Sequence, residues 1–413
     1  MDKRRILVQK YGGTSVADTE RIKNVARRIA DTCREGYHVV AVISALGDTT
    51  DRLVELAYQI TPRPREREMD MLLATGEQIS VALLSMAMHE LGHEAISFTG
   101  AQVGIVTDSA HTKAKILDVK VGRILEELEK GSVVIVAGFQ GVTLDDQITT
   151  LGRGGSDTTA VALAAALGAE VCEIYTDVDG VYTADPRLVP EARKLSRVSY
   201  EEMLEMAATG ARVLQLRSVE FARNYGVVIH VRSSFSQEQG TWITEEDERM
   251  EKAIISGVTH DVSEAKVTVF DVPDRPGVAA ALFKALAAEN INVDMIIQNV
   301  SENQRTDISF TVSKDDLAKA EEITSRVAGE LGAGGVNVDR DIAKVSLVGA
   351  GMRTHPGVAA DMFAALAEND INIEMISTST IKISCVIRAE DVEKAVRAIH
   401  AKFGLDRGVV MRA

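Results

Sequence analysis

The chain has 413 residues and a formal net charge of −15, and at this length about two or three domains are expected rather than one core. The acidic balance argues against nucleic acid and against an anionic membrane as partners, so an anionic substrate would need basic residues gathered locally. Cys33, Cys172 and Cys385 lie far apart without metal-ligand spacing, which is typical of buried thiols in a reducing compartment. Neither an apolar leader nor a run of about 18 apolar residues is present, so we expect a soluble, cytoplasmic protein.

Residues 1–245 are expected to form one α/β domain, in which apolar strands alternate with helices. The expected strands are 4–11, 37–45, 93–100, 132–139 and 170–178, and the expected helices are 20–36, 69–91 and 160–169. Because the strands are apolar almost throughout, the sheet should be covered by helices on both faces. An acidic, turn-rich connector is expected at 246–262.

An internal repeat occupies the C-terminal part of the chain. PGVAAALFKALAAENINVDMI (276–296) aligns without gaps with PGVAADMFAALAENDINIEMI (356–376), and 13 of 21 positions are identical. Each copy has a strand before its Pro-Gly turn, a helix after it, then two strands and a second helix. The repeat predicts two duplicated small domains, at 263–335 and 336–413.

Five polar motifs interrupt the α/β pattern, and each allows two interpretations. The polar run 48–52 after Gly47 is either a ligand-binding loop or a solvated turn. The Gly-Gly turn after Lys10 is either a strand-end turn followed by a helix cap or a turn that holds a phosphate. The glycines around Arg153 are either a connection and cap or a turn whose amides and guanidinium bind an anion. Glu77 is either an exposed helical residue or a ligand contact, and residues 175–187 are either an acidic loop or a nucleotide-binding loop.

Six segments follow one another along the first domain: KYGGTS (10–15), SALGDTTD (44–51), LLATGEQIS (72–80), GFQG (138–141), TTLGRGGSDTTA (149–160) and YTDVDGVYTADPR (175–187). In sequence and in order, these segments resemble those of aspartate kinases, which are members of the amino acid kinase superfamily. The repeated units resemble ACT domains, which bind small regulatory amino acids. The resemblance spans almost the whole chain and implies an amino acid kinase fold, a mostly parallel sheet sandwiched by helices, followed by two ferredoxin-like βαββαβ domains.

The resemblance implies transfer of the γ-phosphoryl group of ATP, with Mg²⁺, to the side-chain carboxylate of L-aspartate, giving 4-phospho-L-aspartate. That reaction is the first step of lysine, threonine and methionine biosynthesis. Lys10 and Asp157 are the implied catalytic residues, while Arg153 and Glu77 are implied to receive the α-carboxylate and the ammonium group of aspartate. The implied ATP-binding residues are Lys10, Tyr11, Gly12, Gly13, Ser44, Thr176, Asp177, Tyr182, Asp185, Pro186, Arg187 and Arg212, and the implied substrate-binding residues are Asp48, Thr49, Thr50, Asp51, Arg52, Glu77, Arg153, Gly154, Gly155 and Ser156. No residue is implied to ligate a resident metal ion.

The ACT resemblance implies a site for feedback by lysine, threonine or both, at an interface between paired ACT domains. The implied effector residues are Asp274, Val278, Ala279, Asn292, Val293, Asp294 and Gln298 in the first copy, and Val358, Ala359, Asn372, Ile373, Ser379 and Thr380 in the second. The second copy has no acidic residue at the position of Asp274, so two equivalent sites are not expected. A role in dimerisation alone is the alternative. We expect a homo-oligomer, or an assembly with a shorter chain that contains the ACT region.

Two other functions remain open. Another carboxylate-phosphorylating amino acid kinase would share the first domain, although Glu77 together with Arg153 suits an α-amino acid. A catalytically dead amino-acid sensor would share both domains, but Lys10 is retained. Two residues depart from the family pattern, since Arg212 stands where Lys is usual and Tyr11 where Phe is common.

Overall fold

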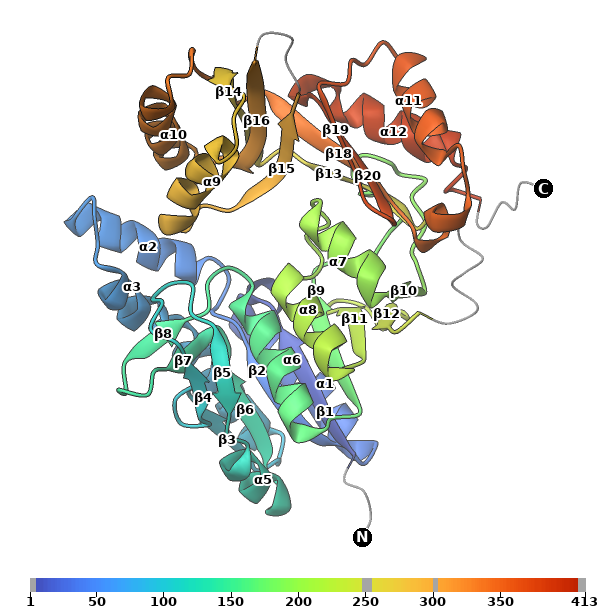
Figure 1. Ribbon diagram of the computed structural model, residues 1–413. Helices are drawn as coiled ribbons and strands as arrows, with labels where there is room; N and C mark the ends of the chain where they lie inside the picture. Colours follow the sequence, from blue (N-terminus) through green and yellow to red (C-terminus); the bar gives the residue numbers. More distant parts are fainter. Residues whose placement is uncertain (1–4, 247–254, 300–303, 408–413) are drawn as a thin grey trace. The chain divides into compact units, whose positions relative to one another are not determined.

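The computed structural model describes residues 5–246, 255–299 and 304–407 (Figure 1). The chain forms two compact units. The first comprises Met1–Val181, Lys194–Ala207 and Arg212–Met250, and the second comprises Tyr182–Arg193, Ala208–Ala211 and Glu251–Ala413. Each unit is described by itself below.

The first unit is built on an eight-stranded sheet with the order β10-β12-β11-β9-β1-β2-β6-β3. Its strands are β1 (Ile6–Tyr11), β2 (His38–Ile43), β3 (Ala95–Phe98), β6 (Val133–Ala137), β9 (Val171–Thr176), β10 (Arg197–Ser199), β11 (Ile229–Ser233) and β12 (Thr241–Thr244). β1 runs parallel to both β2 and β9, and Tyr11 lies opposite Ile43 and Tyr175. The carboxyl ends of these three strands therefore meet at one edge of the sheet, which is where ligands bind in open α/β folds.

Helices cover both faces of this sheet, as the sequence predicts. The helices of the unit are α1 (Thr19–Arg34), α2 (Thr49–Ile60), α3 (Glu66–Leu73), α4 (Thr75–Glu90), α5 (Gly122–Glu129), α6 (Gly155–Leu167), α7 (Tyr200–Ala208) and α8 (Leu216–Tyr225). Tyr11 shares a buried cluster with residues of α1 and α4. The preceding residue, Lys10, instead forms an ion pair with Asp157 of α6. Successive side chains of a strand point to opposite faces, so α6 lies on the face opposite α1 and α4.

A small second sheet has the order β5-β4-β7-β8 and lies beside α3 (Figure 1). Its strands are β4 (Ile105–Thr107), β5 (Ile116–Val119), β7 (Gln140–Val142) and β8 (Ile148–Thr150). None of these strands, each of three or four residues, is predicted from the sequence.

Two helices differ from their sequence predictions. The helix expected at 69–91 is two helices, α3 and α4, which break at Ala74. The polar run 48–52, expected as a loop, begins α2. Leu53, Val54 and Ala57 form a half-buried stripe at helical spacing, so the segment has an inward face although none of its residues is fully buried.

The run Glu66–Glu90 is long and apolar enough to cross a membrane by length and composition alone. Half of its most apolar stretch is buried inside the protein, where Leu84 and Met88 pack in the core with α1. This burial is typical of the core helix of a folded domain.

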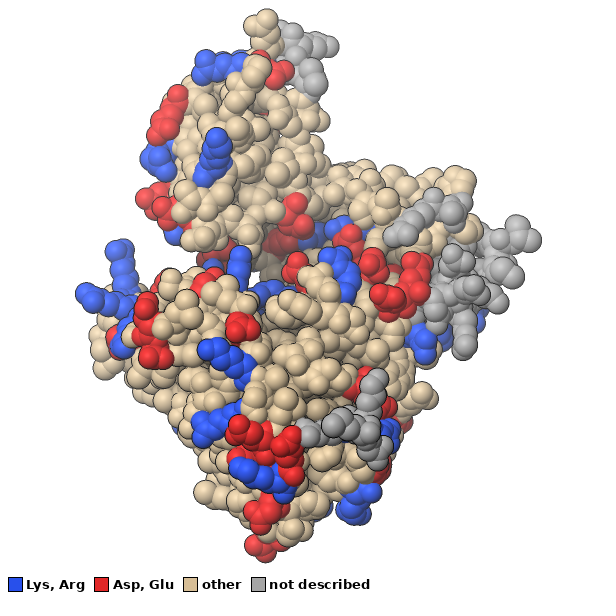
Figure 2. Space-filling view, turned by 60° about the horizontal axis from the view of Figure 1, so that its bottom comes forward, with Lys and Arg blue, Asp and Glu red and all other residues tan. Residues whose placement is uncertain are grey.

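On the face drawn in Figure 2, basic and acidic side chains are interspersed.

The second unit contains two ferredoxin-like halves. The first half has the order β15-β16-β14-β17 and is formed by β14 (Glu264–Pro273), α9 (Val278–Ala288), β15 (Val293–Gln298), β16 (Arg305–Ser313), α10 (Leu317–Leu331) and β17 (Gly335–Asp339). It is a complete βαββαβ motif, in which α9 and α10 pack over the sheet through Leu282, Phe310 and Val327.

The second half has the order β13-β18-β20-β19. It is formed by β18 (Ile342–Val348), α11 (Val358–Ala367), β19 (Met375–Thr378), β20 (Lys382–Arg388) and α12 (Val392–Lys402). Its fourth strand is β13 (Gly257–Asp261), which precedes the first half in the sequence and pairs antiparallel with β18. β13 therefore lies within the expected connector, whose residues 247–254 are outside the described residues.

Residues from the middle of the chain also belong to the second unit. Ala184 and Val189 are buried in the same cluster as Ile399 of α12. The Thr183 hydroxyl lies 2.9 Å from Nε2 of His400, and both residues are buried. The segment 182–193, which follows β9 and the turn after it, is thus part of the second unit.

Candidate active site

Lys10 is the second-last residue of β1, and its ammonium group meets the start of α6. Lys10 Nζ lies 2.7 Å from Asp157 Oδ1, and the two side chains are 12% and 9% exposed. Asp157 is in the first turn of α6, where backbone N–H groups and the helix dipole favour negative charge. The structure therefore brings together the two predicted catalytic residues, and it leaves a cationic group next to a helix N-terminus at the carboxyl edge of the sheet.

The Gly-Gly turn that follows Lys10 is packed tightly against the end of β2. A Cβ on Gly13 would lie 2.9 Å from the carbonyl oxygen of Ala45, so no larger residue fits there. The Gly12 amide donates to the Tyr175 carbonyl at 3.3 Å, which ties the turn to the end of β9. The alternative that Thr14 and Ser15 cap the next helix is wrong. α1 begins at Thr19, and Asp18 caps it by accepting from the Arg21 amide at 2.8 Å.

Glu77 is buried in the first turn of α4, only 3% exposed, and is not the exposed helical residue of the simpler interpretation. Its Oε1 accepts from the Ala45 amide at 3.2 Å, immediately after Ser44 at the end of β2. Within the described part of the chain, its buried Oε2 has no hydrogen-bond partner. Burial raises the pKa of Glu77 to about 7. A buried carboxylate oxygen without a donor is rare, and it fits a site for a cation.

The glycine-rich turn before α6 presents Arg153 to solvent. Gly152 and Gly154 have φ of 77° and 71°, in the left-handed region. A Cβ on Gly154 would also collide with the Gln215 side chain. Gly155 and Ser156 begin α6 and are buried, whereas Arg153 is exposed, and no described carboxylate is paired with it. Its guanidinium is thus available to an anionic ligand.

The remaining predicted substrate residues lie at the start of α2. Asp48 precedes the helix, and Thr49, Thr50, Asp51 and Arg52 form its first turn, with side chains that are exposed or half-buried. Gly76 of α4 packs closely on Ala45, where an added Cβ would lie 2.9 Å from the Ala45 methyl group.

The predicted nucleotide residues divide between the two units. Ser44, Thr176, Asp177 and Arg212 belong to the first unit, and Tyr182, Asp185, Pro186 and Arg187 belong to the second. The Thr176 hydroxyl donates to Asp177 at 3.0 Å. Arg187 forms an ion pair with Asp185 at 2.7 Å, and this contact lowers the pKa of the Asp185 carboxyl.

The predicted effector residues gather in each half of the second unit. Val278, Ala279 and Val293 share a cluster in the first half, and Val358, Ala359 and Ile373 share one in the second. The polar members Asp274, Asn292, Gln298, Asn372, Ser379 and Thr380 are exposed. Asp294 is different, because its carboxylate accepts from Nζ of Lys344, a buried lysine that also bonds Glu264 at 2.6 Å.

Among the described residues, no group of three or more His, Cys, Asp and Glu side chains could hold a metal ion. Mg²⁺ is usually bound through one or two carboxylates and substrate phosphates.

Arg217 of α8 supports the site and is not predicted from the sequence. Its guanidinium donates to the carbonyl of Leu151 at 2.8 Å and to that of Ala114 at 3.0 Å. These bonds fix the chain one residue before Gly152. A single arginine in an amphipathic helix gives no sequence signal for such a role.

Known proteins match the chain over nearly its full length. A model of the amino acid kinase family matches residues 5–233, and a model of the ACT domain matches residues 271–327 and 345–403. An aspartokinase of Mycolicibacterium smegmatis is 58% identical over 405 residues, covering 97% of this chain and 96% of the relative. An aspartokinase of Corynebacterium glutamicum is 54% identical over 413 residues, covering 98% of each chain.

A solved structure shares this fold. The crystal structure of Escherichia coli aspartokinase III in complex with aspartate and ADP aligns with a TM-score of 0.82 at 26% identity, covering 96% of this chain and 99% of that one. The fold, the order of its domains and the similarity over both halves all agree. The chain belongs to the aspartokinases, enzymes of the amino acid kinase family that carry ACT domains.

Proposed function

We propose that this enzyme transfers the γ-phosphoryl group of ATP to the side-chain carboxylate of L-aspartate, giving 4-phospho-L-aspartate for lysine, threonine and methionine biosynthesis. The observation that carries the proposal is the Oε2 of Glu77, which is buried and has no hydrogen-bond partner among the residues that the structure describes. An ammonium group bound there would provide the missing donors and favour the charged carboxylate. Arg153, exposed on the turn before α6, would pair with the α-carboxylate. Together these two groups complement an α-amino acid.

The acceptor carboxylate is already ionised near neutral pH, so the reaction needs no strong general base. Catalysis then rests on alignment and on stabilising the charge of the transferring phosphoryl group. Lys10 is the stabilising cation, and Asp157 holds its ammonium group in place. The N-terminus of α6 adds a positive partial charge beside them. Mg²⁺, when bound with ATP, would neutralise phosphate charge.

The nucleotide assignments are part of the same proposal. Tyr11, Gly12, Gly13 and Ser44 would approach the phosphates from the ends of β1 and β2. The base and ribose side would be formed by Thr176, Asp177, Tyr182, Asp185, Pro186, Arg187 and Arg212. Crystals of the Escherichia coli relative contain ADP and aspartate, which supports a nucleotide site of this kind here.

Regulation by lysine, threonine or both is proposed for the ACT halves, with the exposed residues Asp274, Asn292 and Gln298 as contacts. The Escherichia coli relative was also crystallised with lysine and aspartate, at 27% identity and a TM-score of 0.73. A homo-oligomer, or an assembly with a shorter ACT-containing chain, is proposed as the working form. A cytoplasmic location is proposed as well, and the three cysteines, all free, suit a reducing compartment.

The test is a coupled trapping assay with ATP, Mg²⁺, L-aspartate and hydroxylamine, which converts an acyl phosphate to a stable hydroxamate. Aspartyl hydroxamate formation by the purified protein is the expected result. An absence of hydroxamate from folded protein would support the dead-sensor alternative. Equal rates with L-glutamate would reject the assignment of aspartate as the specific substrate.

A further inference from the structure

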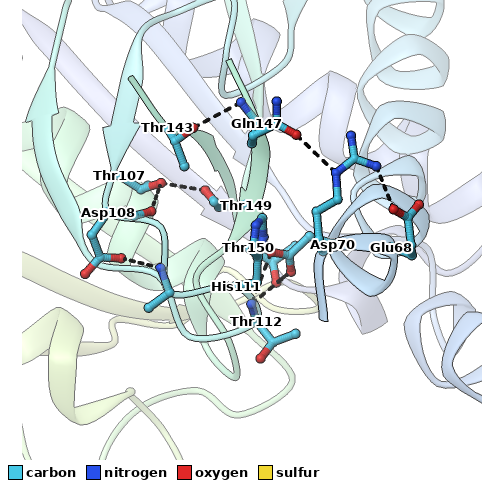
Figure 3. A network of polar contacts seen from close by, with 12 residues as sticks. Glu68, Asp70, Thr107, Asp108, His111, Thr112, Thr143, Gln147, Thr149 and Thr150 are labelled. Carbon is cyan, nitrogen blue, oxygen red and sulfur yellow. Dashed lines mark hydrogen bonds and ion pairs between the residues drawn. The ribbon is translucent and has the colours of Figure 1, made fainter. Parts of the chain in front are cut away.

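Asp70 is a fully buried carboxylate in α3 that belongs to no predicted motif. Its Oδ1 accepts from the Thr150 hydroxyl at 2.6 Å, and its Oδ2 lies 2.6 Å from Nδ1 of His111. Both oxygens lie 3.1 Å from the Thr112 amide (Figure 3). A carboxylate with donors on both oxygens is well satisfied, and these donors come from two different segments of the small sheet.

Both segments adjoin the turn that carries Arg153: one continues into it along the chain, and the other packs against it. Thr150 ends β8, so only Leu151 separates it from the turn at Gly152. Thr112 lies in the loop between β4 and β5 with a φ of 65°, an uncommon conformation for a residue other than glycine. A Cβ on Gly152 would lie 2.9 Å from the Thr112 carbonyl oxygen, so the turn rests directly on this residue.

Two buried or half-buried side chains thus fix the start of the turn. Asp70 bonds Thr150 and Thr112. Arg217 bonds the carbonyls of the residues Leu151 and Ala114. The Ala114 amide closes the arrangement by donating to the Thr150 carbonyl at 3.0 Å.

We propose that Asp70 is a positioning residue for the amino-acid substrate, because it fixes the turn from which Arg153 projects. The inference rests on the proposed function, in which Arg153 receives the α-carboxylate of aspartate. Loosening the turn would weaken this contact equally in the ground state and in the transition state. The KM for aspartate should therefore rise while kcat and the KM for ATP change little.

The neighbouring residue Thr149 provides a matched control. It is fully buried on the same strand, and its hydroxyl lies 2.6 Å from that of Thr107 rather than near Asp70 (Figure 3). Thr149→Val and Thr150→Val therefore each remove one buried hydroxyl from adjacent positions of β8. Only the second removes a bond to Asp70.

The experiment measures steady-state hydroxamate kinetics and melting temperature for the full-length wild type, Thr149→Val, Thr150→Val, Thr150→Ser and Asp70→Asn. We expect Thr150→Val to raise the KM for aspartate about fivefold, the factor that one lost hydrogen bond gives. Thr150→Ser, which keeps the hydroxyl group, should have the same KM for aspartate as the wild type. Thr149→Val should lower the melting temperature about as much as Thr150→Val but leave both KM values unchanged. Asp70→Asn should raise the KM for aspartate at an unchanged KM for ATP.

An equal KM for aspartate in Thr149→Val and Thr150→Val would overturn the positioning role, as would a parallel rise in the KM for ATP. If the wild type forms aspartyl hydroxamate and either of these results is obtained, only this inference is rejected and the proposed function stands. A folded wild type without aspartyl hydroxamate rejects the proposed function, and the positioning role with it, since Arg153 would then have no aspartate to receive.

Discussion

Glu77 is a residue whose burial is unfavourable unless a ligand is present. Its carboxyl group lies in the protein interior, where Oε1 accepts from the Ala45 amide and Oε2 has no partner among the described residues, and burial raises its pKa to about 7. At pH 8 the folded protein must hold an anion that the unfolded chain would expose to water. A binding site often keeps such a group because the ligand later supplies the missing partners.

Glu77→Gln should therefore stabilise the unliganded enzyme at pH 8 while removing its affinity for aspartate. The pKa of Glu77 rises from its usual 4.5 to about 7 on folding. The protonated Glu77 therefore favours the folded state at low pH, and this contribution to folding stability is lost as the pH rises from 4.5 through 7. A neutral glutamine avoids a penalty of about 3 kcal/mol at pH 8 and almost none at pH 4.5. Thermal unfolding at both pH values measures the difference. Glu90→Gln, an exposed change on the same helix, is the control and should shift neither curve. If Glu77→Gln stabilises the protein at pH 8 no more than it does at pH 4.5, the raised pKa assigned to Glu77 is contradicted.

Lys10, like Glu77, is a residue at which one substitution should change the enzymatic activity of a protein that still folds. Lys10→Ala should reduce kcat about a hundredfold or more, because it removes the cation proposed to stabilise the transferring phosphoryl group. Lys23→Ala, an exposed change on α1, should leave kcat unchanged. Hydroxamate kinetics at saturating ATP and aspartate measure both. Near wild-type turnover of Lys10→Ala would show that another group carries this charge.

At the scale of whole elements, the sequence predicts the long apolar strands and the repeat well, because each carries many residues of one pattern. β1, β2, β6 and β9 lie where their apolar runs predict them. The start of α2 and the cap Asp18 are not predicted, since a polar run after glycine suits a loop and a helix start equally. β13 is not assigned for another reason. Its partner β18 is more than eighty residues away, and nothing local records that pairing.

The same contrast applies to the candidate site. Lys10 and Asp157 belong to predicted motifs, and the structure places them in contact. The burial of Glu77 is not predicted, because it depends on the approach of Gly76 to Ala45. Asp70 has even less local signal, since its partners come from β8 and from the loop before β5.

The turn before α9 is the element in which we expect feedback to be detectable. Asp274 is exposed, and its amide donates to the Gln304 carbonyl at 2.7 Å, while its side chain has no bonded partner within residues 5–246, 255–299 and 304–407. Asp274→Ala should therefore leave the uninhibited rate and the stability unchanged while weakening inhibition by lysine or threonine about tenfold, as expected for a lost charge-assisted contact. Asp315→Ala, an exposed change before α10, is the control. Inhibition titrations with each amino acid, alone and combined, measure the effect. An unchanged titration would exclude Asp274 from the effector site.

At the scale of the molecule, the second unit is assembled from segments that are distant in sequence. The segment 182–193 continues the chain beyond β9, yet its backbone and side chains are held by α12. The Leu188 carbonyl accepts from Arg397 at 2.7 Å, and Thr183 meets His400. Residues proposed to bind the nucleotide are therefore fixed to an ACT half by a few identifiable contacts, and these contacts can be weakened individually.

We expect His400 to make this attachment sensitive to pH. Burial lowers the pKa of its imidazole below the usual 6.5, outweighing the opposite influence of Asp406 and Glu191. Because the unfolded chain binds a proton that the buried imidazole does not, stability is present above pH 6.5 and is lost as the pH falls below it. His400→Gln, which can still bond Thr183, should abolish this loss, whereas His93→Gln in the first unit should retain it. Hydrogen exchange of residues 182–193 and of α12 at pH 7.5 and 5.5, corrected for intrinsic rates, measures the effect. Wild-type and His400→Gln protection that fall together at pH 5.5 would show that another group governs this attachment.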